Sequence, residues 1–146
     1  MAEKDLLIPD KNGYLEIEDQ QKIYWEYFGN GEKEVLCLLN GLAMKTESWY
    51  GFLQYVYPEY DIILYDYLGQ GKSSCEDSPY SISAFAGYLS QIMDLLHIDK
   101  IHAMGISYGG FIGAEFARRF PEKLHTLTIS GILLDREVSF DLYHEL

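Results

Sequence analysis

The sequence contains few cysteines, few basic residues and no long hydrophobic run. Its two cysteines, Cys37 and Cys75, are too few for a disulfide framework and show no metal-ligand spacing, so we expect free thiols in a reducing compartment. No stretch is apolar enough to span a bilayer, and residues 1–10 lack the basic and apolar regions of a signal peptide. These absences predict a cytoplasmic protein that neither crosses nor binds a membrane.

Acidic residues far outnumber basic ones. The chain has 11 Lys and Arg against 23 Asp and Glu, which gives a net charge of -12 at pH 7. The negative electrostatic field of such a charge repels nucleic-acid phosphates and anionic lipids, which argues against both as partners. Hydrophobic residues make up 48% and aromatic residues 15% of the 146 residues, which is typical of a globular chain and not of a disordered one. The length predicts one domain or part of one.

Short apolar runs alternate with helical patterns along the chain. The first thirty residues indicate two strands joined by a turn at Asp19-Gln20. Continuous apolar runs typical of buried strands cover residues 35–39, 62–65, 101–104 and 124–129. Helical patterns cover residues 47–57, 82–96 after an N-cap at Ser81, and 108–120 before the stop at Pro121. Strands that alternate with helices predict an α/β fold with a largely parallel sheet.

The sharpest motif is Gly-Ile-Ser-Tyr-Gly at residues 105–109. It lies between a predicted buried strand and a predicted helix, which is the context of a nucleophile elbow. A tight turn that raises Ser107 above the sheet needs small neighbours, which Gly105 and Gly109 supply. The N–H of Tyr108, the first of the new helix, is then free to bind a developing oxyanion. The alternative is a glycine-rich turn with an incidental serine, but because motif and context agree we favour a nucleophile.

Two further segments follow predicted strands. Asn40-Gly41-Leu42 comes after the first buried strand, and Asp-Tyr-Leu-Gly-Gln-Gly-Lys-Ser occupies residues 66–73 after the second. With these three motifs the sequence resembles the α/β-hydrolase superfamily, in its small-molecule serine hydrolase branch of esterases, lactonases, carbon–carbon bond hydrolases and thioesterases. The resemblance covers residues 13–132. It implies an α/β-hydrolase fold with a mostly parallel sheet, truncated after about the sixth strand.

The resemblance also implies roles for the residues around the elbow. Ser107 attacks the substrate, while the backbone N–H groups of Leu42 and Tyr108 form the oxyanion hole. Gly41 lets the backbone approach the substrate closely. Asn40 stands where family members usually have His, and we interpret it as a structural variant that still makes loop hydrogen bonds.

The segment Gly-Gln-Gly-Lys-Ser at residues 69–73 also looks like the end of a phosphate-binding loop. That motif needs glycine where Asp66 stands, and a carboxylate there would repel phosphate, so an NTPase is disfavoured. In the hydrolase family Asp66 ties its loop together, and we assign neither Asp66 nor Ser73 a catalytic role. The sequence supports no dinucleotide motif, and we expect neither a cofactor nor a metal.

A serine hydrolase also needs a base and an acid, which in this family follow the serine in the order acid, then histidine. His97 ends a predicted helix, and His102 and His125 begin predicted strands at the sheet end away from the motif. His144 lies in the tail and is at most a surrogate base. Asp135 is a candidate acid, although a solvated loop carboxylate at the start of a cap region is the better interpretation.

We therefore interpret residues 1–146 as the N-terminal part of a single α/β-hydrolase domain. In this interpretation residues 13–132 are core strands and helices, residues 133–146 begin the cap region, and the C-terminal half is absent. The family's strand order, 1-2-4-3-5-6-7-8, leaves the sixth strand as an open edge that invites association. The expected partners are a small-molecule substrate and either the missing C-terminal half or a second copy paired through that edge.

The leading hypothesis is a serine hydrolase that acts on a small carboxylic ester, lactone, thioester or related carbonyl substrate through an acyl-enzyme. Without an acid and a histidine, the isolated chain is expected to be nearly inactive. The alternative is a non-catalytic fragment or interaction module on a hydrolase scaffold. An epoxide hydrolase or dehalogenase is disfavoured, because those relatives need a carboxylate nucleophile where Ser107 stands.

Overall fold

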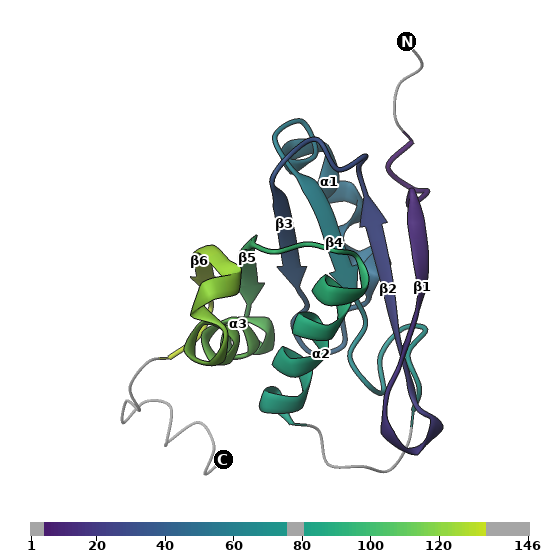
Figure 1. Ribbon diagram of the computed structural model, residues 1–146, viewed down its shortest axis with the longest axis vertical. Helices are drawn as coiled ribbons and strands as arrows, with labels where there is room; N and C mark the ends of the chain where they lie inside the picture. The colour runs from purple at the N-terminus through teal and green to yellow at the C-terminus, as the bar shows by residue number, and fades with distance from the viewer. Residues whose placement is uncertain (1–4, 76–80, 134–146) are drawn as a thin grey trace, which may run out of the picture.

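Six strands form one sheet in the computed structural model, which describes residues 5–75 and 81–133 (Figure 1). The spatial order is β1-β2-β4-β3-β5-β6, with β1 and β2 antiparallel to their neighbours and the other four strands parallel to one another. The strands are β1 (Lys11–Glu16), β2 (Lys22–Phe28), β3 (Val35–Leu39), β4 (Asp61–Tyr65), β5 (Ile101–Ile106) and β6 (Leu124–Ser130). This arrangement confirms the predicted α/β fold and its mostly parallel sheet.

The helices lie close to their predicted positions. They are α1 (Tyr50–Val56), α2 (Ile82–Leu95) and α3 (Tyr108–Arg119), with 3₁₀ turns η1 (Glu18–Gln20), η2 (Thr46–Trp49) and η3 (Pro121–Lys123). The helix expected over residues 47–57 is shorter, because the Ser48 hydroxyl accepts from the N–H of Lys45 at 3.1 Å and the first turn tightens into η2. None of these helices is long and apolar enough to cross a membrane.

Helices cover both faces of the sheet. Helices α2 and α3 pack on one face and α1 on the other (Figure 1). Side chains alternate along β3, so that Val35, Cys37 and Leu39 face α2 and α3. Leu36 and Leu38 face α1. All of them are buried, which explains why this strand reads as a continuous apolar run.

Strand β6 lies at one edge of the sheet. It pairs with β5, and within residues 5–75 and 81–133 no strand pairs with its outer side. Its residues alternate between exposed and part-buried positions, unlike the fully buried β3. In the part of the chain that the structure describes, the sixth strand is therefore an open edge.

The packing of β3 predicts different reactivities for the two thiols. Cys37 is fully buried, which raises the pKa of its thiol, whereas Cys75 is exposed. Because the thiolate is the reactive form, we expect a reagent such as DTNB to modify one cysteine per native chain and both after denaturation. The Cys75→Ser variant should show no fast labelling until it is denatured. Rapid native labelling of that variant would contradict the burial of Cys37.

Candidate active site

Ser107 occupies the turn between β5 and α3. Its φ of 51° and ψ of -121° lie outside the regions that L residues prefer, so the turn is strained. A Cβ on Gly105 would overlap the backbone of Gly109, and a Cβ on Gly109 would overlap the carbonyl oxygen of Leu39. Both glycines are therefore sterically required by this turn. Ser107 itself is exposed at the C-terminal end of β5.

The segment after β3 borders this serine. A Cβ placed on Gly41 would be 3.7 Å from the Cβ of Ser107. Tyr108 is the first residue of α3, so its N–H has no acceptor within the helix. Leu42 is exposed and lines the same cavity as Tyr108. The structure thus brings the expected nucleophile and the two expected oxyanion-hole residues together at the C-terminal ends of β3 and β5.

Asn40 holds the loop after β3 in place. Its side chain is fully buried, with Nδ2 donating to the carbonyl oxygen of Tyr65 at 3.1 Å. Its Oδ1 accepts from Nε1 of Trp49 at 2.7 Å. The Tyr67 hydroxyl donates to the Asn40 carbonyl at 2.8 Å. These bonds tie the loop to β4 and η2, so Asn40 positions the loop backbone.

Asp66 fixes the loop after β4. It is fully buried, and its two oxygens accept from the backbone N–H groups of Thr46 at 2.8 Å and Lys72 at 2.9 Å. The Ser73 hydroxyl donates to the Asp66 carbonyl at 2.6 Å. Burial raises the pKa of the Asp66 carboxyl, although the two N–H donors oppose that shift. Because both oxygens bind loop amides, Asp66 ties the loop together.

An apolar cavity of about 470 Å³ lies beside the elbow. Its lining residues are Leu42, Ala43, Tyr67, Leu68, Gly69, Gln70, Phe85 and Tyr108. The rings of Tyr67 and Phe85 stack at 5.1 Å, and Tyr108 meets Tyr67 edge-on at 5.9 Å. This size and lining suit a small, largely apolar molecule. Sequence reasoning missed Tyr67 and Phe85, although the place of Tyr67 just after a buried strand was a usable signal.

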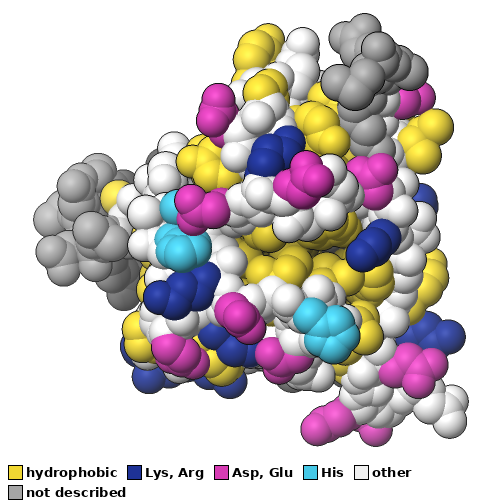
Figure 2. Space-filling model, turned by 45° about the horizontal axis from the view of Figure 1, so that its top comes forward, with side chains coloured by type: hydrophobic (Ala, Val, Ile, Leu, Met, Phe, Trp, Pro, Cys, Tyr) yellow, Lys and Arg dark blue, Asp and Glu magenta, His cyan; other side chains and the backbone are white. Residues whose placement is uncertain are grey.

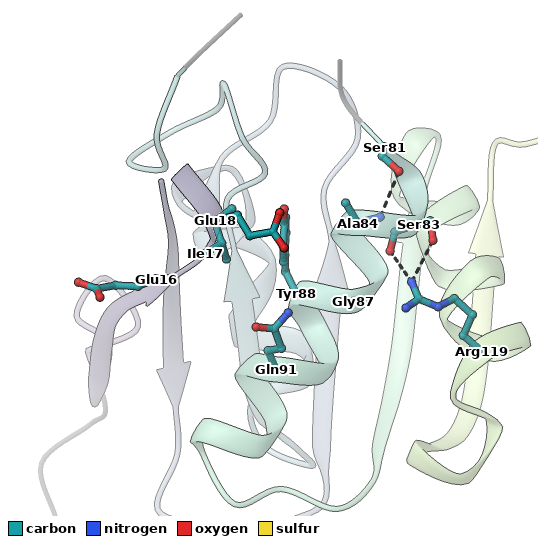
Figure 3. Close-up of a pocket in the computed structure, with 10 residues that line it drawn as sticks. All are labelled: Glu16, Ile17, Glu18, Ser81, Ser83, Ala84, Gly87, Tyr88, Gln91 and Arg119. Carbon is teal, nitrogen blue, oxygen red and sulfur yellow. Dashed lines mark hydrogen bonds between the residues drawn. The ribbon is translucent and has the colours of Figure 1, made fainter. Parts of the chain in front are cut away.

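A larger hollow of about 620 Å³ lies between the turn after β1 and helix α2 (Figure 3). Two serine hydroxyls in its wall already have partners. Ser81 caps α2 as predicted, with its hydroxyl accepting from the N–H of Ala84 at 3.2 Å. The Ser83 hydroxyl accepts from Nη1 of Arg119 at 3.0 Å. Because this hollow contains none of the elbow residues, the candidate active site is the smaller cavity.

The three histidines that the structure describes lie away from Ser107. His102 precedes it by five positions on β5, a separation of about 16 Å at the usual rise of a strand. His125 stacks on His102 with ring centroids 4.9 Å apart. His97 lies between α2 and the start of β5. The other candidates, Asp135 and His144, fall outside the described residues.

Comparison with known proteins agrees with this fold. A family model described as alpha/beta hydrolase fold matches residues 34–143. The chain is 30% identical over 107 residues to the putative carbamate hydrolase RutD of Azorhizobium caulinodans, a match that covers 73% of this chain and 40% of that protein. It is 30% identical over 104 residues to 3-oxoadipate enol-lactonase 2 of Acinetobacter baylyi, covering 71% and 39%. The chain thus spans about two-fifths of the length of these curated relatives.

The fold also matches solved structures. MGS-M2, an alpha/beta hydrolase enzyme from a Medee basin deep-sea metagenome library, gives a TM-score of 0.79 at 25% identity. That match covers 87% of this chain and 46% of the other. The similarity therefore covers most of this chain, and the compared structure is about twice as long as the matched part.

The elbow predicts a large difference between two glycine substitutions. In Gly105→Ala the new Cβ meets the backbone of Gly109, so we expect a loss of about 1–3 kcal/mol in the free energy of unfolding. Gly51→Ala in α1 is the control, because a Cβ there meets nothing within 4 Å and alanine favours a helix. Urea unfolding measures both variants. Equal stabilities would contradict the close contact at the elbow.

The buried amide of Asn40 predicts a pH-dependent defect in Asn40→Asp. The change places a carboxylate oxygen against the carbonyl of Tyr65, so we expect a loss of about 2 kcal/mol or more at neutral pH. Burial would raise the pKa of the new carboxyl, and its protonated form can donate, so the deficit should shrink as the pH falls. Asn12→Asp, at an exposed position in β1, should change stability by no more than about 0.5 kcal/mol. A deficit independent of pH would contradict this account.

Proposed function

The chain belongs to the family of the alpha/beta hydrolase fold, and on this premise we propose that it is a serine hydrolase of small carboxylic esters, lactones, thioesters or related carbonyl compounds. The observation that carries the proposal is the strained Ser107 at the β5–α3 turn, with the N–H of Tyr108 and the loop of Leu42 beside it. The relatives named as a putative carbamate hydrolase and an enol-lactonase support a carbonyl compound as the substrate.

In the proposed reaction Ser107 Oγ attacks the carbonyl carbon, and its proton passes to a base. The electron pair of the carbonyl bond moves to the oxygen, which the N–H groups of Tyr108 and Leu42 stabilise. Collapse of this intermediate expels the alcohol, thiol or ring oxygen, which takes the proton from the base, and leaves an acyl group on Oγ. Water then attacks the acyl carbon and releases the acid. The apolar cavity beside Tyr108 accommodates the acyl part.

We propose that the base and acid come from polypeptide that joins the sheet at β6. The carbonyl of Ser130, the last residue of β6, accepts from the N–H of Ser107 at 2.8 Å, so this strand ends beside the nucleophile. Gly131 follows with a φ of 72°, and a Cβ built on it would lie 3.7 Å from the backbone nitrogen of Ser107. A parallel strand added to the open edge would also end near Ser107. The C-terminal half of the hydrolase fold would supply it, whether that half continues this chain or belongs to another one.

A non-catalytic interaction module on the same scaffold is the second candidate. The observation that favours it is that none of the histidines within residues 5–75 and 81–133 lies near Ser107. The two candidates differ in whether Ser107 reacts as a nucleophile.

A fluorophosphonate probe separates the two functions. We expect wild type to gain one adduct slowly, over a long incubation with excess probe, because the oxyanion hole still acts without a base. The adduct is measured by intact mass and located on Ser107 by peptide mapping. The variant Ser107→Ala should gain none. Ser130→Ala is the matched control, because it removes an exposed hydroxyl from the same end of the sheet and should label like wild type.

The rate at which the chain hydrolyses an activated ester shows whether it contains its own base. A chain that lacks its base retains only oxyanion-hole and binding effects, so we expect turnover of an activated ester only about 10³–10⁴-fold above water. A full esterase rate that depends on Ser107 would show that this chain holds its own base. Absence of any adduct on wild type would overturn the proposal in favour of the non-catalytic module.

A further inference from the structure

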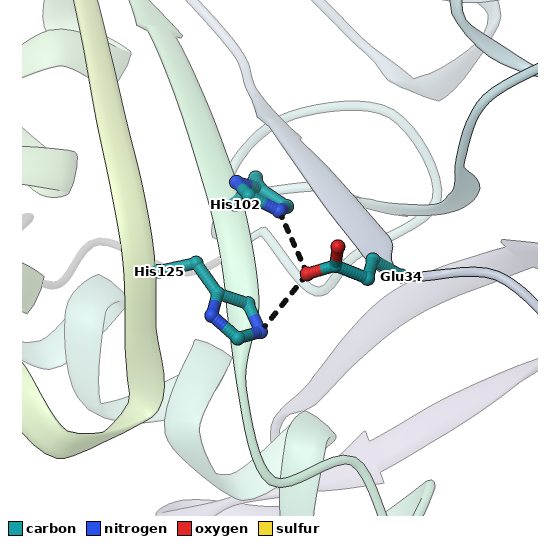
Figure 4. Close-up of side chains that lie close together, drawn as sticks. All are labelled: Glu34, His102 and His125. Carbon is teal, nitrogen blue, oxygen red and sulfur yellow. Dashed lines mark hydrogen bonds and ion pairs between the residues drawn. The ribbon is translucent and has the colours of Figure 1, made fainter.

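Glu34, His102 and His125 converge at the end of the sheet opposite to Ser107 (Figure 4). Nε2 of His102 lies 3.1 Å, and Nε2 of His125 lies 3.2 Å, from the same Oε2 of Glu34. With one ligand atom taken from each residue, all three atoms lie within 4.8 Å of one another. Among the residues that the structure describes, no other set of three His, Cys, Asp or Glu side chains is so placed.

The strand order and one irregularity create this cluster. Glu34 directly precedes β3, while His102 and His125 are the second residues of β5 and β6, and these three parallel strands are neighbours. The register shifts at this point, because Ile101 pairs with Leu124 but His102 pairs with Thr126. His125 is thus an extra residue, and such a bulge redirects a side chain that regular alternation would send to the other face. The two imidazole rings consequently stack at 4.9 Å with an interplanar angle of 27°.

We infer that these three side chains bind a Zn²⁺ ion, with water as the fourth ligand. Bonds of about 2.0–2.1 Å in a tetrahedral site require ligand atoms about 3.4 Å apart. The two observed separations, 3.1 and 3.2 Å, fall close to this value. Two imidazole nitrogens and one carboxylate oxygen suit zinc, whereas Mg²⁺ and Ca²⁺ require oxygen ligands. The sequence predicted no metal site, so this inference departs from that prediction.

The surroundings of His102 orient it as a ligand. Its Nδ1 lies 2.7 Å from Oγ1 of Thr126, which can accept the Nδ1 proton and leave the Nε2 lone pair for the ion. The ring of Tyr60 packs edge-on against His102 at 5.3 Å. The side chain of His102 is 17% exposed, but that of Glu34 is 62% exposed, so water and the ion have access from the Glu34 side.

The charge of the chain favours cation capture at this end. Figure 2 is tilted toward the N-terminal ends of the parallel strands and shows, at its left, histidine side chains with both acidic and basic side chains beside them. The net charge of -12 attracts cations to the surface in general. The two imidazole ligands then favour Zn²⁺ over Mg²⁺. Binding joins the starts of β3, β5 and β6 and stabilises the edge strand, far from the proposed chemistry.

Isothermal titration of the chelator-treated chain with zinc chloride tests the site. We expect one ion per chain, and a loss of more than about 100-fold in affinity for His125→Gln, since even outer-shell changes cost 10–100-fold. His97→Asn is the matched control, because it removes an exposed imidazole outside the cluster and keeps a residue that tolerates the φ of 56°. Ser107→Ala should bind zinc like wild type, which separates this test from that of the proposed function.

Thermal unfolding supplies a second readout. Zinc should raise the melting temperature of wild type and His97→Asn, and leave that of His125→Gln and Glu34→Gln unchanged. Glu34 and His125 are exposed, so both variants should keep the fold, as circular dichroism would verify. Equal zinc affinity in wild type and His125→Gln, an equal shift with magnesium chloride, or no binding by folded wild type would each overturn the inference.

Discussion

The close approach of α3 to the end of β3 is the constraint on which the candidate active site depends. Gly109 has no room for a Cβ against the carbonyl of Leu39, and Gly105 has none against Gly109. The first turn of α3 therefore lies directly on the sheet, and Ser107 is held at a φ of 51° between two fixed elements. Strain of this kind persists only where the surrounding structure determines it, and here the fully buried β3 and the partly buried β5 do so. The same contact places the loop after β3 next to the serine.

Buried polar side chains hold the loops around this turn. Asn40 and Asp66 are fully buried, and each bonds to a segment distant in sequence. Desolvation works against the charged carboxylate, as the raised pKa of Asp66 shows, but the N–H groups of Thr46 and Lys72 offset part of that cost. These partners restrict the loops that border Ser107. Fixed donors are what oxyanion stabilisation requires.

Some parts of this structure could be predicted from the sequence and others could not. Val35–Leu39 was predictable because burial on both faces demands an unbroken apolar run. The elbow was predictable because its steric limits allow only glycine at two positions. Phe85 gave no signal as a cavity residue, since in α2 it looks like any core position of an amphipathic helix. The cluster around His102 and His125 gave none either, because it depends on strand order and on a shift in register.

The two ends of β5 and β6 hold different candidate sites, and the register between the two strands connects them. At one end the carbonyl of Ser130 accepts from the N–H of Ser107, and at the other His102 and His125 share Glu34. A slip of β6 by one residue would turn its side chains to the opposite face and remove the carbonyl from Ser107. The proposed zinc ion lies about 16 Å from Ser107, so it would act by fixing that register and not by touching substrate. Strand β6 pairs with only one described neighbour, so its register is less constrained than that of the inner strands. A bound ion would therefore stabilise the register of this strand more than that of the inner strands.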